Sequence, residues 1–256
     1  MKIMLYTLLL IVTGNIALAQ KARFITSGSI EFQRTANTFA ILRKMIGNNM
    51  DGLTQQAYDQ YKKTQPQFKT INSTLTFNTD KTLYTPAAVD NSTRSIFGPL
   101  PMAEQNNLVY TDLATKTGVC QKNVFEEVFL IKDTLRKIKW KITDETREIA
   151  GYTCRRANAL ILDSIYVVAF YTDQIPLSGG PESFTGLPGM ILQVALPHEN
   201  VVWLATKVTD TSIPVTSIVP AKKGKAVTFK EFEATLQSAA KNRGPSAPYI
   251  VRGFLL

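Results

Sequence analysis

A thiol and an imidazole, Cys154 and His198, are the residue types in this chain that could form a nucleophile and its general base. The 256 residues hold two cysteines and a single histidine. Cys154 lies in a strand-like stretch, and His198 lies in the turn-forming sequence Pro197–Asn200. A structural cysteine and a surface histidine explain these settings better than a reactive pair. We therefore predict no catalytic residue.

Neighbouring acidic residues, Glu126 with Glu127 and Asp144 with Glu145, are the next candidates for acid–base chemistry. Adjacent side chains of a strand point to opposite faces, so neither pair can act as a couple. The spacing of His, Cys and carboxylates matches no zinc-type site, and no glycine pattern of a P-loop or dinucleotide site stands between a strand and a helix. We predict neither a metal nor a cofactor.

The N-terminus has the pattern of a secretory signal peptide. Lys2 supplies a positive start, Ile3–Val12 is apolar, and Ala17–Ala19 places small residues where a signal peptidase cuts. The apolar stretch is shorter than the ~20 residues of a spanning helix, so an N-terminal anchor or buried helix is the less favoured alternative. We predict a signal peptide over residues 1–19, cleaved after Ala19. Residues 20–256 then form one exported domain, in the periplasm or at the outer membrane.

Export would place Cys120 and Cys154 in an oxidising compartment, where they are a candidate disulfide. Two cysteines alone do not establish the geometry that a disulfide requires. Three alternatives stay open: a disulfide, two buried thiols, or one reactive thiol.

The chain is basic, with 29 Lys and Arg against 20 Asp and Glu and a net charge of +9. Its densest basic run, Arg136–Lys141, alternates lysines with apolar residues, which is typical of a half-buried strand with a solvated basic face. A basic exported protein could contact an anionic membrane surface peripherally. No basic helical stripe and no pattern of stacking aromatic residues is present, so nucleic acid is not a predicted partner.

Short apolar runs between turn residues predict an α+β fold that is mainly β, with an antiparallel sheet that curls or closes. Helical spacing over Asn37–Lys63 predicts one or two N-terminal helices, ended by Pro66. A capping box at Thr228–Glu231 predicts a C-terminal helix over Lys230–Lys241, and Thr85–Gln105 reads as a long loop. The predicted strands are Arg23–Arg34, Phe68–Asn78, Lys81–Pro86, Asn107–Asp112, Val124–Lys132, Lys139–Ile142, Thr146–Ala159, Ser164–Thr172, Met190–Leu196 and Val201–Thr209.

The predicted strand Ser164–Thr172 is apolar on both faces. Such a strand is either central in a covered sheet or lines an apolar cavity. The buried-core interpretation is the more common one. The alternative is an apolar groove lined by the alternate residues Ile165, Val167, Ala169 and Tyr171.

Pro176–Gly189, with the sequence PLSGGPESFTGLPG, contains seven Gly or Pro among fourteen residues. Proline lacks a backbone donor and glycine permits positive φ, so this segment is neither a helix nor an interior strand. We call it the Gly/Pro loop and expect it to be a shaped loop that leads into the strand at Met190.

Within this loop, the residues Gly186–Ile191 resemble the signature of the GLPGLI family, exported proteins of Bacteroidetes-type bacteria whose function is unknown. The strong resemblance runs from Phe129 to Leu196, and Met190 replaces the usual leucine. Other matching segments are Leu130–Asp133, Ile138–Trp140, Asp144–Ile149, Gly151–Cys154, Tyr171–Thr172, Ile175–Pro176 and Gly180–Pro181. The resemblance implies the family-motif residues Gly180, Pro181, Gly186, Leu187, Pro188 and Gly189. By analogy it also implies a strongly curved, half-barrel-like sheet around an apolar groove.

These observations favour a non-enzymatic binding or carrier protein of the cell envelope that holds an apolar or lipid-like ligand in a groove of a curved sheet. The alternative is a protein that interacts with an outer-membrane transport complex. An enzyme is the least favoured function class. The expected partners are an envelope protein or an apolar ligand.

Overall fold

The computed structural model describes residues 24–47, 51–87, 97–98, 100–241 and 244–256. The predicted signal peptide and its cleavage point after Ala19 lie outside the described residues. So do positions 88–96 and 99 of the predicted loop Thr85–Gln105. In the described part of that stretch, Thr85 and Pro86 end a strand, and Pro101–Glu104 forms the short helix α4.

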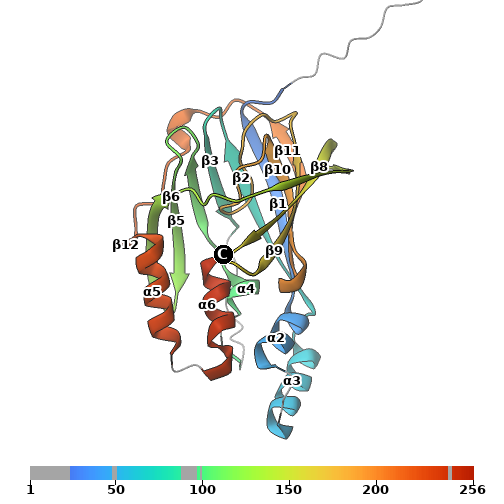
Figure 1. Cartoon of the computed structure of the whole chain (residues 1–256), viewed down its shortest axis with the longest axis vertical. Helices are drawn as coiled ribbons and strands as arrows, with labels where there is room; N and C mark the ends of the chain where they lie inside the picture. Colours follow the sequence, from blue (N-terminus) through green and yellow to red (C-terminus); the bar gives the residue numbers. More distant parts are fainter. Residues whose placement is uncertain (1–23, 48–50, 88–96, 99, 242–243) are drawn as a thin grey trace, which may run out of the picture.

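Within the described residues, twelve strands form one mixed sheet whose two edges stay unpaired, so the sheet is not closed (Figure 1). The predicted mainly β, α+β class is confirmed at this level. The prediction of a purely antiparallel sheet is wrong, because the last strand, β12, reaches the far edge just before a helix and runs parallel to β6. The order across the sheet is β12 (Lys225–Val227), β6 (Glu127–Thr134), β5 (Thr117–Val124), β4 (Leu108–Asp112), β3 (Lys81–Pro86), β2 (Phe68–Phe77), β1 (Gly28–Asn37), β11 (Val201–Asp210), β10 (Met190–Leu196), β9 (Ile165–Thr172), β8 (Tyr152–Ile161) and β7 (Lys141–Ile149).

Strand β1 lies near the middle of the sheet and shows how alternation selects the core. Ile30 and Phe32 are buried, whereas Glu31 and Gln33 are exposed. Successive side chains of a strand point to opposite faces. Arg34 occupies the next inward position and is also buried, so the same alternation carries a charged group into the interior.

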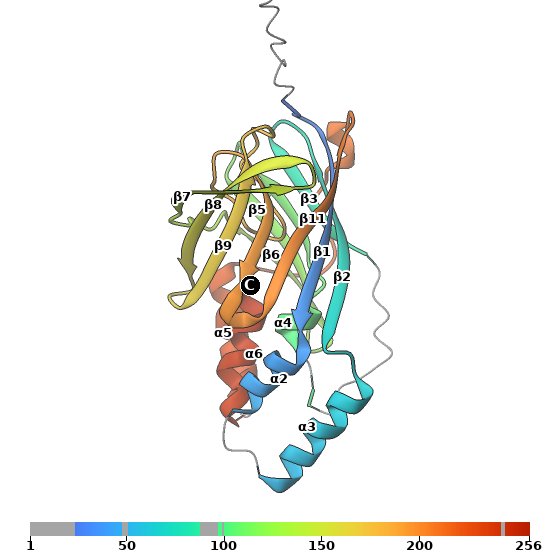
Figure 2. The same cartoon turned by 90° about the vertical axis from the view of Figure 1, so that its right-hand side faces the viewer.

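The N-terminal segment forms two helices, as predicted. The side chains of Asn37 and Asp51 accept backbone N–H groups at the starts of α2 (Thr38–Ile46) and α3 (Gly52–Thr64). Such caps satisfy donors that a helix leaves without a partner. Helix α3 ends before Pro66, and it lies beyond one end of the sheet (Figure 2).

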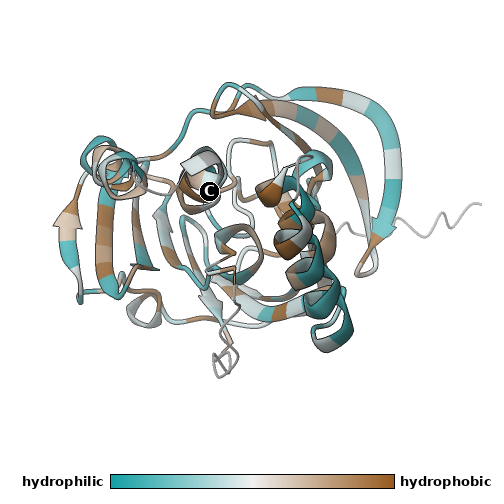
Figure 3. Ribbon diagram, turned by 90° about the horizontal axis from the view of Figure 1, so that it is seen from below, coloured by the Kyte–Doolittle hydropathy of each residue, from teal (hydrophilic) through white to brown (hydrophobic). Residues whose placement is uncertain are grey.

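Two helices close the chain, where the sequence predicted one. The capping box between Thr228 and Glu231 is present at the start of α5 (Phe229–Ala240). The second helix, α6 (Ala247–Leu255), packs beside α5, and its end lies near the middle of the molecule with strands to either side (Figure 3). No described helix has the length and apolar character needed to cross a membrane. The part of the chain that the structure describes also holds the 3₁₀ turns η1 (Pro197–Glu199), η2 (Val215–Ser217) and η3 (Gly244–Ser246).

Two predicted strands each contain a hairpin turn. Val124–Lys132 turns at Phe125 and Glu126, whose φ angles are 48° and 74°. Thr146–Ala159 turns at Ala150 and Gly151, with φ angles of 50° and 83°. Two consecutive positive φ angles define the tight hairpin turn that usually takes Asn and Gly. Phe125 and Glu126 do not have that signature, so the sequence pattern missed this turn.

Candidate functional site

The Gly/Pro loop between β9 and β10 is a buried, irregular segment. At Gly189, φ is +152° and an added Cβ would lie 2.1 Å from the carbonyl oxygen of Thr172. At Gly180 an added Cβ would lie 2.7 Å from the Phe184 carbonyl oxygen. Only glycine fits such close backbone approaches. The motif residues Gly180, Pro181, Leu187 and Gly189 are buried or close to backbone atoms, and Gly186 and Pro188 lie at the surface.

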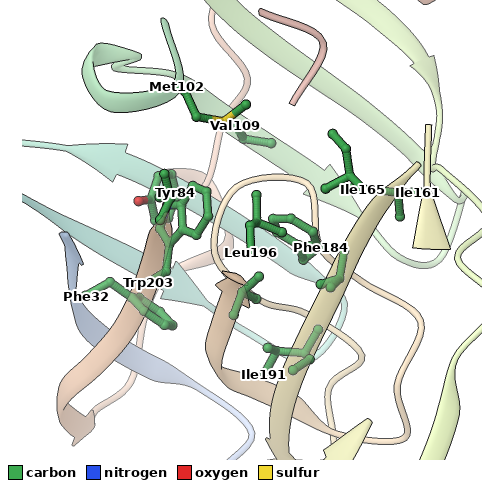
Figure 4. Packing of buried hydrophobic residues seen from close by; sticks show 14 of the residues in the cluster. Phe32, Tyr84, Met102, Val109, Ile161, Ile165, Phe184, Ile191, Leu196 and Trp203 are labelled. Carbon is green, nitrogen blue, oxygen red and sulfur yellow. The ribbon is translucent and has the colours of Figure 1, made fainter. Parts of the chain in front are cut away.

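The loop packs into the core through its apolar side chains. The Phe184 ring meets the Trp203 ring edge-on, with centroids 5.9 Å apart. Figure 4 shows Phe184 among the buried side chains of β9, β10 and β11, including Ile191 and Leu196. The loop therefore serves as part of the interior of the fold.

The chain between β6 and β7 runs against the same loop. Trp140 Nε1 donates a hydrogen bond to the Thr185 carbonyl oxygen at 2.9 Å. The Trp140 indole also lies 3.4 Å from the position of a Cβ at Gly186, where φ is +99°. A side chain at Gly186 would therefore touch the tryptophan, and the positive φ would strain any residue other than glycine.

Glu182 places a carboxylate in the interior. It is 6% exposed and its φ is 51°, in the left-handed region. Asn107 Nδ2 donates to Glu182 Oε2 at 2.9 Å. Burial raises the pKa of the Glu182 carboxyl, and the nearby charges of Arg34 and Lys122 oppose that rise. Burial of a carboxylate is costly, so its partners matter.

Arg34 lies near this carboxylate, and both residues line the same small internal pocket. Its guanidinium donates to the carbonyl oxygens of Gln105, at 2.5 Å, and Met102. It also stacks 5.1 Å from the centroid of the Trp203 ring. Burial lowers the pKa of Arg34, and Glu182 opposes the change. The guanidinium thus ties β1 and β11 to the segment that precedes β4.

Lys122 of β5 is buried as well, with 5% of its surface exposed. Its Nζ donates to the Phe254 carbonyl oxygen at 3.0 Å and to Gln105 Oε1 at 3.2 Å. Burial lowers the pKa of the ammonium, while Cys120 and Glu182 act to raise it. In the described chain, no ion pair joins Lys122, Arg34 or Glu182 to an oppositely charged group.

The last turn of α6 is held by these side chains. Its consecutive carbonyl oxygens at Gly253, Phe254 and Leu255 accept hydrogen bonds, from Gln105 Nε2 at 2.8 Å, Lys122 Nζ at 3.0 Å and Arg136 Nη2 at 2.9 Å, respectively. The last carbonyls of a helix have no partner within the helix. Residues from outside α6 supply those partners here.

A cleft of about 390 Å³ opens beside Lys122, between the sheet and the C-terminal residues. Its walls come from four places: strands β4 to β6, the link after β6, the Gly/Pro loop, and the C-terminal helices. The lining residues are Val109, Thr111, Gly118, Val119, Cys120, Lys122, Ile131, Asp133, Thr134, Leu135, Arg136, Lys137, Glu182, Ser183, Phe229, Leu255 and Leu256. This is the size of a small-molecule site, roughly 300–1,000 Å³.

Two further groups define the chemistry of the cleft. Arg136 is half-buried, and its guanidinium lies 5.5 Å from the centroid of the Phe229 ring. Burial lowers the pKa of Arg136. Burial also raises the pKa of the Cys120 thiol to about 11, against the opposing effects of Lys122 and Arg136. The cleft therefore combines apolar walls, an inert thiol, and the charged side chains of Lys122, Arg136, Lys137, Asp133 and Glu182.

The structure places the predicted groove residues in the packed core. Ile165, Val167, Ala169 and Tyr171 are at most 3% exposed and belong to the main hydrophobic cluster. None of them lines the cleft. The groove interpretation of β9 is therefore wrong, because β9 is covered on both faces. The cleft beside Lys122 lies instead along β4, β5 and β6.

The two cysteines are free thiols, so the disulfide alternative is wrong. Cys120 lies on β5 and Cys154 on β8, strands that stand far apart in the order of the sheet. Burial raises the pKa of Cys154 as well, to about 12.

Cys154 and His198 are not brought together. His198 lies beside Tyr166, with ring centroids 6.2 Å apart. Cys154 is next to Arg155 on β8, and Arg155 pairs with Tyr171 of β9. Tyr171 lies five positions from Tyr166, the residue beside His198. Five residues of a strand span about 17 Å. Within the described ranges, no three His, Cys, Asp or Glu side chains cluster so as to hold a metal ion.

Sequence reasoning missed the buried polar residues Arg34, Lys122 and Glu182. Charged residues are almost never fully buried unless they are paired, so their residue types gave no reason to place them in the interior. One signal was present, because Arg34 continues the inward alternation of Ile30 and Phe32. No pattern marked Glu182 inside the Gly/Pro loop.

A family model described as "Protein of unknown function (Porph_ging)" matches residues 160–193, which hold β9, the Gly/Pro loop and the start of β10. A comparison with curated protein sequences finds no match.

One solved structure shares the fold at low sequence identity. A structure of PNGF-II is 17% identical with a TM-score of 0.51, and the match covers 82% of this chain and 33% of that one. The chain thus spans about a third of PNGF-II. An uncharacterized conserved protein from Thermus thermophilus is 5% identical over 82% of this chain and 98% of that chain, with a TM-score of 0.39.

Proposed function

We propose that this chain is an exported binding or carrier protein of the GLPGLI type, which holds an apolar or lipid-like ligand in the cleft beside β5. The observation that carries the proposal is the cleft itself, with a volume of about 390 Å³. Its walls include Val109, Val119, Ile131, Leu135 and Phe229. Burying apolar surface stabilises a complex by roughly 25 cal/mol per Å².

The proposal includes a bend of the sheet into a half-barrel, and the link between β6 and β7 supports it. These strands are second and twelfth in the sheet order. Ten strand spacings would separate them by roughly 48 Å in a flat sheet. The chain from Thr134 to Lys141 reaches at most about 25 Å when fully extended. A bend that brings the two halves of the sheet together reconciles the two lengths.

The contacts of the Gly/Pro loop support the same bend. The loop begins and ends at β9 and β10, yet Gly179 packs against Thr82 of β3, and Glu182 binds Asn107 just before β4. Three strands, β11, β1 and β2, lie between those anchors in the sheet. The loop reaches both halves across the hollow of the proposed half-barrel and forms one wall of the cleft.

The cell envelope is the proposed setting because of the leader sequence with Ala17–Ala19. The test is expression of the exported chain, followed by native mass spectrometry for a co-purified lipid and by titration with dodecanol. We expect a bound apolar molecule in the wild type. Val119→Trp, which fills the cleft, should abolish binding. Leu160→Trp, at a side chain 63% exposed and outside the cleft, should leave binding unchanged. A wild type that carries no lipid and takes up no dodecanol would contradict the proposal.

A further inference from the structure

The cleft is apolar along most of its wall, but its charged groups are unbalanced. Lys122 and Arg136 bring two positive charges to its inner surface. We infer that the cleft binds a single-chain amphiphile with an anionic head, and that the head contacts Lys122 and Arg136. This inference rests on the proposed function and names the class of ligand.

Lys122 has a free donor for such a head. An ammonium group carries three N–H donors. Two of them are used, by the Phe254 carbonyl oxygen and by Gln105 Oε1. Both acceptors are neutral, so the positive charge itself stays uncompensated by direct contact. A buried charge is stabilised when an opposite charge pairs with it. An anion in the cleft would supply that pairing.

Arg136 offers a second point of contact. Its guanidinium has five N–H donors, and one of them, on Nη2, bonds the Leu255 carbonyl oxygen at 2.9 Å. The group lies over the Phe229 ring at the cleft wall. Planar guanidinium groups bind carboxylate and phosphate oxygens through two parallel hydrogen bonds. The remaining edge of Arg136 suits a head of that shape.

The two side-chain carboxylates of the cleft, Asp133 and Glu182, already have other hydrogen-bond partners. Asp133 Oδ2 accepts the backbone N–H of Phe229 at 3.0 Å, and Asp133 Oδ1 accepts that of Thr134 at 2.7 Å. Glu182 accepts from Asn107, and the charges of Arg34 and Lys122 both act on it, although neither forms an ion pair with it. Lys137, at the cleft rim, adds another positive charge. The balance of charge therefore favours an anion over a cation or a neutral head.

The rest of the wall determines the remainder of the ligand. Val119, Ile131, Leu135 and Leu255 present aliphatic surface beside the two cations. An inorganic anion would leave that surface in contact with water, and a neutral hydrocarbon would leave the charges unpaired. An amphiphile with one alkyl chain satisfies both parts of the wall.

The test compares three probes of equal chain length: dodecanoate, dodecyl phosphate and dodecanol. Titration calorimetry is run on the wild type below the critical micelle concentration of each probe. We expect at least one anionic probe to bind about tenfold or more tightly than dodecanol, since a charge-assisted hydrogen bond is stronger than a neutral one. The tighter of the two anionic probes identifies the head as a carboxylate or a phosphate.

Three variants assign the effect to residues. Lys122→Met and Arg136→Gln should reduce the preference for the anion to less than about threefold, with dodecanol affinity unchanged. Lys139→Met is the matched control, because Lys139 is exposed and does not line the cleft. Circular dichroism verifies the fold of each variant, and the comparison of probes in the wild type depends on no variant.

The outcomes separate the two proposals. If dodecanol binds as tightly as both anions, the inferred head group is wrong and the apolar carrier stands. A preference for the anion that survives in both folded variants overturns the assignment to Lys122 and Arg136. If the wild type binds no probe at all, the proposed function fails together with the inference.

Discussion

Asn107 Nδ2 donates a hydrogen bond to Glu182 Oε2 at 2.9 Å, although 75 positions separate the two residues. Asn107 Nδ2 also donates to Gln105 Oε1 at 2.8 Å. Both Asn107 and Glu182 are buried. This pair fixes the Gly/Pro loop to the segment that precedes β4, and so to the half of the sheet that carries the cleft.

The first prediction concerns the charge on Glu182. Burial raises the pKa of Glu182 in the folded state above the ordinary value of 4.5. Between the unfolded-state pKa and the folded-state pKa, the folded protein therefore binds more protons than the unfolded protein. The contribution of Glu182 to stability therefore falls as pH rises through that window. Glu182→Gln keeps a hydrogen-bond acceptor for Asn107 and has no charge to bury, so its stability should not fall with rising pH for this reason. We expect the free energy of unfolding of the variant, relative to that of the wild type, to increase as pH rises above 4.5.

Urea unfolding at a series of pH values measures that gain. Glu126→Gln, at an exposed turn position, is the matched control and should give a curve parallel to that of the wild type. Parallel curves for Glu182→Gln as well would show that the buried carboxylate has no raised pKa.

The second prediction concerns backbone space in the Gly/Pro loop. Gly189→Ala forces a Cβ to within 2.1 Å of the Thr172 carbonyl oxygen, so the loop or β9 must shift. We expect a loss of about 3 kcal/mol or more in the free energy of unfolding. Gly151→Ala is the control, because its φ of +83° is also positive but its added Cβ meets no atom within 4 Å. It should cost about 1 kcal/mol. Equal losses of unfolding free energy in the two variants would show that the contact with the Thr172 carbonyl oxygen adds nothing to the cost of the positive φ.

The third prediction concerns the start of α5. The Asp133 carboxylate accepts the backbone N–H of Phe229, and its hydrogen bonds hold its pKa below the ordinary value of 3.8. Asp133→Ala should cost about 1 kcal/mol at neutral pH. A lowered pKa means that this contribution is present above pH 3.8 and is lost as pH falls through the folded value.

Thermal unfolding at neutral and acidic pH checks this effect of Asp133→Ala. Asp144→Ala, at a fully exposed side chain that pairs loosely with Arg155 at 3.8 Å, should change the midpoint by less than half as much. A loss for Asp133→Ala that persists unchanged in acid would mean that the carboxylate charge is not its source.

The fourth prediction concerns the thiols. With pKa values raised to about 11 for Cys120 and about 12 for Cys154, both should react slowly with iodoacetamide at neutral pH, because the thiolate is the nucleophile. Cys120 should react first, since it is half-buried at the cleft while Cys154 is fully buried. Unfolding in urea without reductant should release two reactive thiols. Detection of none would restore the disulfide.

Much of the fold follows from local patterns, and the site does not. Alternation in Ile30 and Phe32 and the capping box at Thr228 predicted their elements. The turn at Phe125 and Glu126 was missed, since its positive φ angles arise from the pairing of β5 with β6. The cleft depends on Lys122, whose burial is set in part by a carbonyl oxygen 132 positions away. Contacts between residues so far apart in the sequence produce no periodic pattern from which they could be predicted.

The way in which the last turn of α6 is held has a consequence for the order of folding. Its carbonyls at Gly253, Phe254 and Leu255 are bonded by side chains that lie 148, 132 and 119 positions earlier in the chain. A short helix has little stability on its own. Closing loops of this length costs conformational entropy before the stabilising contacts can form. We therefore expect the C-terminal turn to become ordered late, after β4 and β5 have paired, so that the inner wall of the cleft is completed only at that stage.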